Sequence, residues 1–423
     1  TDRDRSSSFH HLSYLQLAIS PMFRVNTTPH PLSILFILSV GSFAWRRLPL
    51  ALAFAVSPIS SSLPKSAAIT MAASAAPSTI GPNVLRTLVQ DASISTQKQS
   101  LDLNGIVWLE HLNLVVGDMA LAKKFYIEFL GLSRDENPKH FNLGQQQFHI
   151  AANEEPPQRV TGSIGLAVPS LQRIRERVGN AQLDLEGTQF SIVNDDKVAI
   201  MTITCPWGNT FHLYDISIDE QHPVDLTGES SQKMVKMHAE GGAYGPHRMS
   251  VRGNPGIRYV EIACRMGTVD SIAEFYEQML GCHVTRTNAE LDIDSTTNDG
   301  SNASSEVKVA IVCVGPGVHM AFVENQQLSD NAIQQMEGVH ACFYIPNFQG
   351  TYNTLKDRNL IWTNPRFTHL DSCDSWEEAC ASRTLRFKDI LDVKTGEKVL
   401  EFEHETRPMM HGQYMKVPRY DPN

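Results

Sequence analysis

The sequence contains no Cys-x-x-Cys pair, although it has seven cysteines, at positions 205, 264, 282, 313, 342, 373 and 380. This absence excludes a zinc knuckle and a dithiol redox motif, and the odd number argues against a disulfide framework. Cys264 and Cys313 lie in apolar, strand-like runs, where a thiol packs as a small hydrophobic group. The cysteines therefore indicate a reducing compartment.

Acidic residues are missing from a long N-terminal stretch, since Met22 to Gln90 contains no aspartate or glutamate. Residues 1–90 carry seven Lys/Arg and two Asp, a net charge of +5, whereas the whole chain carries −10. The remainder therefore carries −15. An acidic body without a basic stripe excludes nucleic acid as a partner.

This stretch is rich in Ser, Ala, Pro and Leu, a composition typical of a transit peptide. Its apolar run, 32–45, is shorter than the roughly 20 residues of a membrane span. A signal-like core before a basic segment resembles the bipartite leaders of algae with secondary plastids, and Ser42-Phe43-Ala44 resembles their cleavage motif. We therefore expect residues 1–90 to be a targeting or disordered leader, and the mature protein to lie in a plastid without a membrane segment. Cytoplasmic and mitochondrial locations are the alternatives.

Two parts of the chain repeat one pattern, an apolar strand followed by a helix that contains a Phe-Tyr pair and ends at a glycine. The repeated parts are 107–116, Phe125-Tyr126 and Gly131 in the first copy, and 257–265, Phe275-Tyr276 and Gly281 in the second. Aligning the two Phe-Tyr pairs places His111 opposite Glu261 without a gap.

Each copy continues with a second strand-helix-strands module, which begins near Ser163 in the first copy and near His340 in the second. The chain is thus expected to contain four such modules in series, with polar surface insertions at 289–306 and 368–382. The expected divisions are a leader (1–90), a first domain (105–218), a linker (219–254), a second domain (255–408) and a C-terminal tail (409–423).

The chain resembles the vicinal oxygen chelate superfamily, which includes glyoxalase I, extradiol dioxygenases, methylmalonyl-CoA epimerase and bleomycin-resistance proteins. The resembling stretches are E-H-L-N-L-V-V-G-D at 110–118, F-Y-I-E-F-L-G-L at 125–132, C-P-W-G-N-T-F-H-L at 205–213 and V-L-E-F-E-H-E at 399–405. The resemblance implies an α+β fold in which four βαβββ modules form two domains. Their sheets curl into cups, and each module offers up to two metal ligands from its first and last strands.

Carried over to the second copy, these positions give one complete ligand set: Glu261, His319, His340 and Glu401. Two imidazoles and two carboxylates suit a divalent ion such as Zn²⁺, Ni²⁺, Fe²⁺, Mn²⁺ or Mg²⁺. By resemblance to glyoxalase I, Glu261 and Glu401 are also the candidate general bases. The first copy offers His111, His149 and His212, with Ser163 in the remaining position, and we expect a weaker or lost site there.

Two alternatives stay open at this point. A lone histidine in a strand is more often a packed, hydrogen-bonded core residue than a ligand, and strand alternation turns His404 away from Glu401. The modules also allow a second pairing, in which the first and fourth share a cup. The site would then comprise His111, His149, His340 and Glu401.

The ligand set favours a metal-dependent, glyoxalase-like lyase or isomerase that acts on a small molecule with vicinal oxygens through an enediolate-type intermediate. An extradiol-type ring-cleaving dioxygenase is the second interpretation, disfavoured because Glu261 stands where such an enzyme carries a histidine. The third is a non-catalytic small-molecule-binding protein of the bleomycin-resistance type. In each case the expected partner is a small molecule, and the chain is expected to be a monomer with an internal pseudo-dimer.

Overall fold

The structure is a computed structural model, which describes residues 80–98, 105–144, 146–152, 155–194, 200–215, 256–290, 306–315 and 317–414. These residues all belong to one unit, Ile69–Asn423. Most of the expected leader, the linker and the core of the first insertion lie outside the described residues. No helix among the described residues is long and apolar enough to span a membrane.

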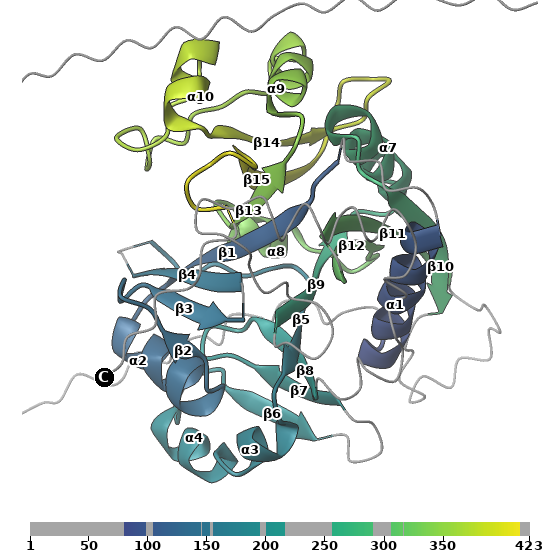
Figure 1. Ribbon diagram of the computed structural model, residues 1–423. Helices are drawn as coiled ribbons and strands as arrows, with labels where there is room; N and C mark the ends of the chain where they lie inside the picture. The colour runs from purple at the N-terminus through teal and green to yellow at the C-terminus, as the bar shows by residue number, and fades with distance from the viewer. Residues whose placement is uncertain are drawn as a thin grey trace, which may run out of the picture. The chain divides into compact units, whose positions relative to one another are not determined.

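Four modules follow one another along the chain, as the sequence predicts (Figure 1). The first comprises β1 (Trp108–Val116), α2 (Met119–Lys123), η1 (Lys124–Phe129), β2 (Ser133–Arg134), β3 (His140–Leu143) and β4 (Gln146–Ala152). The second comprises β5 (Ser163–Val168), α3 (Leu171–Arg175), α4 (Val178–Asp184), β6 (Ser191–Asn194), β7 (Ile200–Thr204) and β8 (Thr210–Asp215).

The third module comprises β9 (Gly256–Cys264), α7 (Val269–Leu280), β10 (Val284–Glu290), β11 (Glu306–Gly315) and β12 (Val318–Glu324). Helix α8 (Asp330–Met336) leads to the fourth, which comprises β13 (His340–Ile345), α9 (Phe348–Asp357), α10 (Trp376–Ser382), β14 (Leu385–Leu391) and β15 (Lys398–Pro408). The fourth module therefore has three strands, not the four expected. A loop and α10 stand between α9 and β14, and Trp376 of α10 packs against Phe348 and Tyr352 of α9.

The strands form two sheets, and each sheet combines modules from both sequence copies. The seven-stranded sheet has the order β14-β15-β13-β1-β4-β3-β2, and the eight-stranded sheet β10-β11-β12-β9-β5-β8-β7-β6. The first module thus pairs with the fourth through β1 and β13, and the second with the third through β5 and β9. This is the second of the two pairings that the sequence leaves open. The boundaries of the two sequence domains stay a prediction, because each copy contributes strands to both sheets.

The Phe-Tyr pairs of the repeat link the two sheets. Tyr126 of η1 packs on Phe148 of the seven-stranded sheet, and Phe125 packs on Phe211 of the eight-stranded sheet. The second pair, on α7, makes the corresponding contacts with the roles of the sheets exchanged: Tyr276 packs on Phe322 in β12 and Phe275 on Phe387 in β14. Both helices are followed by a glycine with a left-handed φ, Gly131 at 77° and Gly281 at 66°. The alignment that revealed the repeat therefore corresponds to a shared packing role.

Helix α1 (Pro82–Lys98) packs against the eight-stranded sheet, next to β11 (Figure 1). Leu85, Val89 and Ala92 recur at helical spacing, and they are buried with Val309, Ile311 and Val323 of that sheet. The folded unit therefore begins before residue 90, where the composition placed the end of the leader. The sequence analysis did not predict this apolar helical face, because the composition of residues 1–90 indicated a leader.

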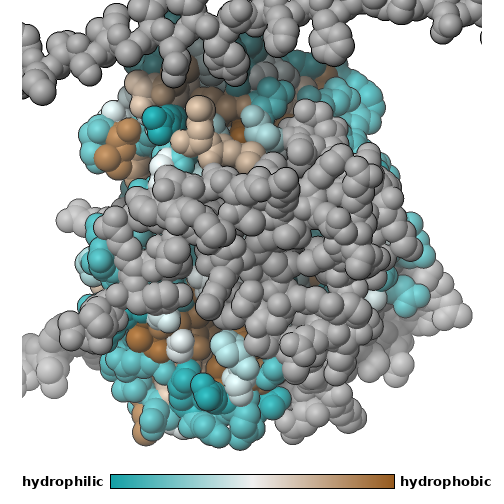
Figure 2. Space-filling view, viewed as in Figure 1, coloured by the Kyte–Doolittle hydropathy of each residue, from teal (hydrophilic) through white to brown (hydrophobic). Residues whose placement is uncertain are grey.

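The outer surface follows the amphipathic pattern of the helices. Figure 2 shows mainly hydrophilic side chains over α3 and α4, where Leu171 and Ile174 point inward and are buried. Leu183 of α4 is an exception, since it is 76% exposed. Scattered exposed apolar residues of this kind are ordinary on a protein surface.

The hydrogen bond between the Tyr276 hydroxyl and His404 Nε2, 2.7 Å long, gives the first testable prediction. His404 Nδ1 donates to the Phe402 carbonyl, so Nε2 must accept from Tyr276. Burial lowers the pKa of His404 to about 3, which keeps the imidazole neutral. Tyr276→Phe should lower the free energy of unfolding by about 1–3 kcal/mol, because it leaves a buried acceptor unpaired.

Tyr126→Phe is the matched control, since the buried Tyr126 hydroxyl has no hydrogen-bond partner among the described residues. Its stability in urea unfolding should stay within about 0.5 kcal/mol of the parent chain or rise slightly. Equal losses in the two variants would contradict the proposed role of the Tyr276 bond.

Candidate metal centre

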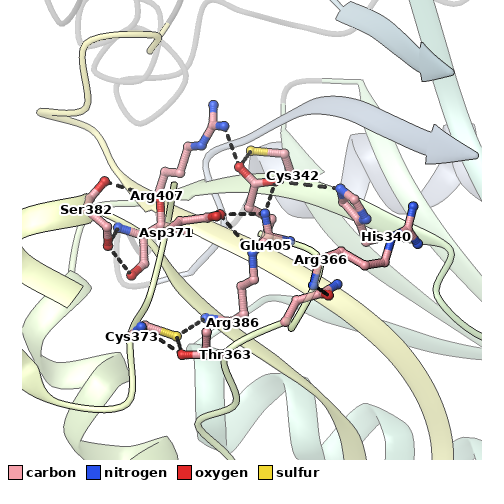
Figure 3. Close-up of polar contacts among 12 residues, drawn as sticks. His340, Cys342, Thr363, Arg366, Asp371, Cys373, Ser382, Arg386, Glu405 and Arg407 are labelled. Carbon is pink, nitrogen blue, oxygen red and sulfur yellow. Dashed lines mark hydrogen bonds and ion pairs between the residues drawn. The ribbon is translucent and has the colours of Figure 1, made fainter. Parts of the chain in front are cut away.

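Three side chains of the seven-stranded sheet converge on one point: His111 of β1, His340 of β13 and Glu405 of β15. Glu405 Oε2 lies 3.7 Å from His111 Nε2 and 3.6 Å from His340 Nε2. All three residues are buried, and one ligand atom from each lies within 4.8 Å of the others. His340 and Glu405 are labelled in Figure 3.

Strand register explains why these residues meet. In the antiparallel pairing of β1 with β13, His111 lies opposite Cys342, and in the parallel pairing of β13 with β15, Cys342 lies opposite Glu405. His340 is two residues before Cys342 and therefore shares its face of the sheet. A register shift between Leu109 and His111 marks a β-bulge at Glu110, so that Glu110 and His111, although adjacent, both reach the site.

Each of the two histidines has a carboxylate near its other ring nitrogen. His111 Nδ1 lies 3.3 Å from Glu110 Oε2, and His340 Nδ1 lies 4.0 Å from Glu403 Oε2. A carboxylate hydrogen-bonded to the far nitrogen is the usual support for a metal-binding histidine, because it fixes the tautomer and directs the opposite nitrogen to the ion. Glu110 gives His111 this support, whereas the buried His340 Nδ1 has no hydrogen-bond partner among the described residues. Consistent with this arrangement, the buried His111 Nε2 has no hydrogen-bond partner among the described residues.

The surroundings carry an excess of negative charge. Arg386 bonds Asp371 at 2.6 and 2.9 Å, Glu403 at 2.6 Å and Glu405 at 2.7 Å. Arg407 pairs with Glu110 at 3.0 Å and with the second oxygen of Glu405. When ionised, these four carboxylates exceed the two guanidinium groups by two negative charges. Uncompensated buried charge is very costly, and a divalent cation would balance it.

Electrostatics keep two of the three ligands, Glu405 and His340, in the protonation state that binds a cation. Burial alone would raise the pKa of Glu405, but Arg407 and Arg386 hold it well below the usual range. Burial lowers the pKa of His340 well below its usual value, so the imidazole is neutral. Burial opposes protonation of His111 as well, but its interactions with Glu110 and Glu405 outweigh that effect and raise its pKa.

His149 lies beside this group but outside it. It stands opposite Asn113 in the parallel pairing of β1 and β4, and its ring stacks on His111 with centroids 3.6 Å apart. Its Nε2 lies 2.9 Å from Gln147 Oε1 and therefore donates to it. The other face of the ring stacks on His140 at 3.7 Å. Burial lowers the pKa of His149 well below its usual value.

The set of four ligands expected in the second copy is not brought together. Glu261 and His319 lie on the eight-stranded sheet, because β9 pairs with β12 on one side and with β5 on the other. Ser163 Oγ donates to Glu261 at 2.5 Å, and His319 Nε2 lies 3.3 Å from Ser93 of α1. Of the four, only His340 belongs to the described ligand group.

Glu401 lies on the same strand as Glu405 but four residues before it, which is about 13 Å away at about 3.3 Å per residue. It pairs with Lys388 at 2.9 Å and with Lys398 at 2.6 Å near the start of the strand. The sequence analysis chose Glu401 because residues 401, 403 and 405 alternate onto one face of the strand. The register with β13 selects Glu405.

The first-copy candidates are likewise divided between the sheets. His111 and His149 belong to the seven-stranded sheet, whereas His212 belongs to β8 of the eight-stranded one. His212 Nδ1 lies 2.7 Å from the Tyr259 hydroxyl, and burial lowers its pKa to about 4. Within the part of the chain described, both groups with metal-ligand geometry contain His111 and lie on the seven-stranded sheet; the second combines it with Glu110 and Cys342.

Comparisons with solved structures give distant likenesses. Glyoxalase I from Zea mays is 12% identical with a TM-score of 0.40, over 71% of this chain and 92% of that one. A putative dioxygenase from Bacillus subtilis is 12% identical with a TM-score of 0.37, over 74% and 89%. A catechol 2,3-dioxygenase is 12% identical with a TM-score of 0.22, over 75% and 95%. TM-scores this low support no argument about function.

No curated protein matches the chain significantly. The sequence itself does match a family model, over residues 108–204, which cover the first module and most of the second. That model describes the Glyoxalase/Bleomycin resistance protein/Dioxygenase superfamily. The paired strand-helix-strands modules and the His/Glu ligand group agree with the match. Residues 108–204 are therefore similar to this superfamily, the vicinal oxygen chelate proteins.

Proposed function

We propose that the chain is a metal-dependent enzyme whose divalent ion is held by His111, His340 and Glu405. The convergence of their ligand atoms carries this proposal. Two ligands of one ion, each about 2.0–2.2 Å from it, lie about 3–3.5 Å apart. The separations of 3.6 and 3.7 Å at Glu405 Oε2 are close to that spacing and too long for hydrogen bonds.

The composition of this set favours an oxygenase of the extradiol type. Two histidines and one carboxylate on one side of an ion leave positions open for a substrate and O₂. The glyoxalase-like interpretation depended on Glu261 as a fourth ligand, and Glu261 lies on the other sheet. When bound, an Fe²⁺ ion would polarise two vicinal oxygens of the substrate and activate O₂.

The residues around the ion have separate tasks. Glu110 orients His111, and it is itself fixed by the Tyr344 hydroxyl at 3.0 Å and by Arg407. Arg386 and Arg407 hold both oxygens of Glu405, so this carboxylate stays in place as a ligand. His149 donates from Nε2 and keeps Nδ1 as an acceptor, and its lowered pKa keeps the ring neutral, which suits Nδ1 to accept a hydrogen bond from a substrate hydroxyl.

A glyoxalase-like lyase or isomerase is the second candidate, and the position of His149 is the observation that favours it. A neutral imidazole next to the ion could also hold a hydroxyl of an enediol-type intermediate by a hydrogen bond, in a reaction that needs no O₂. A non-catalytic binding protein would leave the charge excess and the paired carboxylate-histidine contacts without a function.

Metal content tests the assignment of ligands. His340→Ala and Glu405→Gln should each weaken metal binding about 100-fold or more, because each removes one ligand. His319→Ala and Glu401→Gln are the matched controls, and they should retain one ion per chain by elemental analysis and by titration. Loss in the controls with retention in the first pair would overturn the proposed site, and so would absence of metal from the parent chain after reconstitution.

Oxygen consumption separates the two candidate reactions. Chain loaded anaerobically with Fe²⁺ should consume O₂ in the presence of a catechol and form a ring-opened product, and Glu405→Gln should abolish this. Exchange of a substrate C–H proton with deuterated solvent, without O₂ uptake, would instead establish the lyase or isomerase reaction. Glu401→Gln controls for loss of a carboxylate on the same strand.

A further inference from the structure

A third arginine, Arg366, lies at the edge of the proposed metal centre, on the loop 358–375 between α9 and α10. The loop is fixed to the site by several bonds. Asn364 Nδ2 donates to both oxygens of Glu403 at 2.8 and 2.9 Å, and Asp371 accepts a hydrogen bond from Arg386. The Arg366 amide donates to Asn364 Oδ1 at 2.9 Å. The position of Arg366 therefore depends on the same carboxylates that surround the proposed ion.

The Arg366 side chain extends beside His340. Figure 3 shows its guanidinium next to the His340 ring, on the side away from Arg386. A Cβ placed on Gly338, two residues before His340, would lie 3.6 Å from Arg366 Nη1. The side chain is 29% exposed, whereas that of Arg386 is 2% exposed. Arg366 therefore lies between the ligand group and the solvent.

The three arginines differ in how strongly their charges are already matched. Arg386 holds three carboxylates and Arg407 holds two. The ion pair of Arg366 is with Glu155, at 3.7 Å, and the Glu155 side chain is 53% exposed. Long pairs in contact with water contribute little, so an incoming anion can replace Glu155 at small cost.

We propose that Arg366 binds a carboxylate of the substrate, and that the substrate is a carboxylic acid that also presents two vicinal oxygens to the ion. This proposal rests on the metal-dependent function proposed above. When the four inner carboxylates are ionised, they, Arg386, Arg407 and a divalent ion together are neutral, which leaves Arg366 to match one further negative charge. One planar guanidinium binds a carboxylate with two parallel hydrogen bonds and balances its single charge, whereas a phosphate dianion would leave one negative charge unbalanced.

The test compares substrate-like probes on chain loaded with Zn²⁺, which binds without redox chemistry. The probes are catechol, 2,3-dihydroxybenzoate and 3,4-dihydroxybenzoate, and calorimetry gives the Kd of each. At least one of the two acids should bind about tenfold more tightly than catechol, as one charge-assisted contact provides. Arg366→Gln should remove this advantage and leave the Kd of catechol within about twofold. Glu155→Gln should increase the advantage, because it removes the competing carboxylate.

Arg265→Gln is the matched control. Arg265 also has an exposed ion pair, with Asp330, and it directly follows β9 of the eight-stranded sheet. The Arg265→Gln variant should prefer the acids over catechol as strongly as the parent chain does. The inference is overturned if neither acid binds more tightly than catechol, or if Arg366→Gln keeps the preference. If the chain binds no metal, or if catechol binds equally with and without the metal, the proposed metal-dependent function also fails. This result can be distinguished from the two that overturn the inference about Arg366 alone.

Discussion

The antiparallel pairing of β1 with β13 is the contact on which the proposed centre depends. It sets His111 opposite Cys342, two residues from His340, and the neighbouring β15 then brings Glu405 to the same row. Without this pairing the histidines belong to unrelated edges of two sheets, and the carboxylates around them have no shared counter-charge. The bulge at Glu110, the two inner arginines and the loop that carries Arg366 are all arranged around this junction.

Much of this architecture could be predicted from local sequence patterns. Helices and strands recur with the periods of an amphipathic helix and a buried strand, and the Phe-Tyr pairs mark equivalent packing positions. The choice of partner modules is different, because the first strands of all four modules are similarly apolar and any two can form an antiparallel pair. Which modules pair depends on the relative free energies of the two complete sheets, to which every module contributes. The pairing therefore cannot be predicted from any short segment of the sequence. Likewise, Glu401 and Glu405 share one face of β15, and only the register with β13 distinguishes them.

The two sheets share one arrangement of modules but differ in the side chains at equivalent positions. At the positions equivalent to the ligands, the eight-stranded sheet has Ser163, His212 and Glu261, and these side chains bond to neighbouring protein groups. Helix α1 then adds its apolar face to that sheet, together with Tyr259 and Ala321. Direct hydrogen bonds and apolar packing thus stabilise one sheet, whereas the other keeps carboxylates that lack enough cations. The first arrangement stabilises the fold directly, and the second fits the metal centre proposed above.

The exchange of modules between the sheets also sets the order in which the protein can fold. His111 and His340 meet across roughly 230 residues of chain, so closing this loop is slow compared with forming any single module. During synthesis the first module leaves the ribosome long before its partner exists, with the edge of β1 unpaired and prone to association. During this interval the first module can already dock on the second through Phe125 of η1 and Phe211 of β8. A fragment that ends before β13 would contain a complete sequence repeat and still lack the centre.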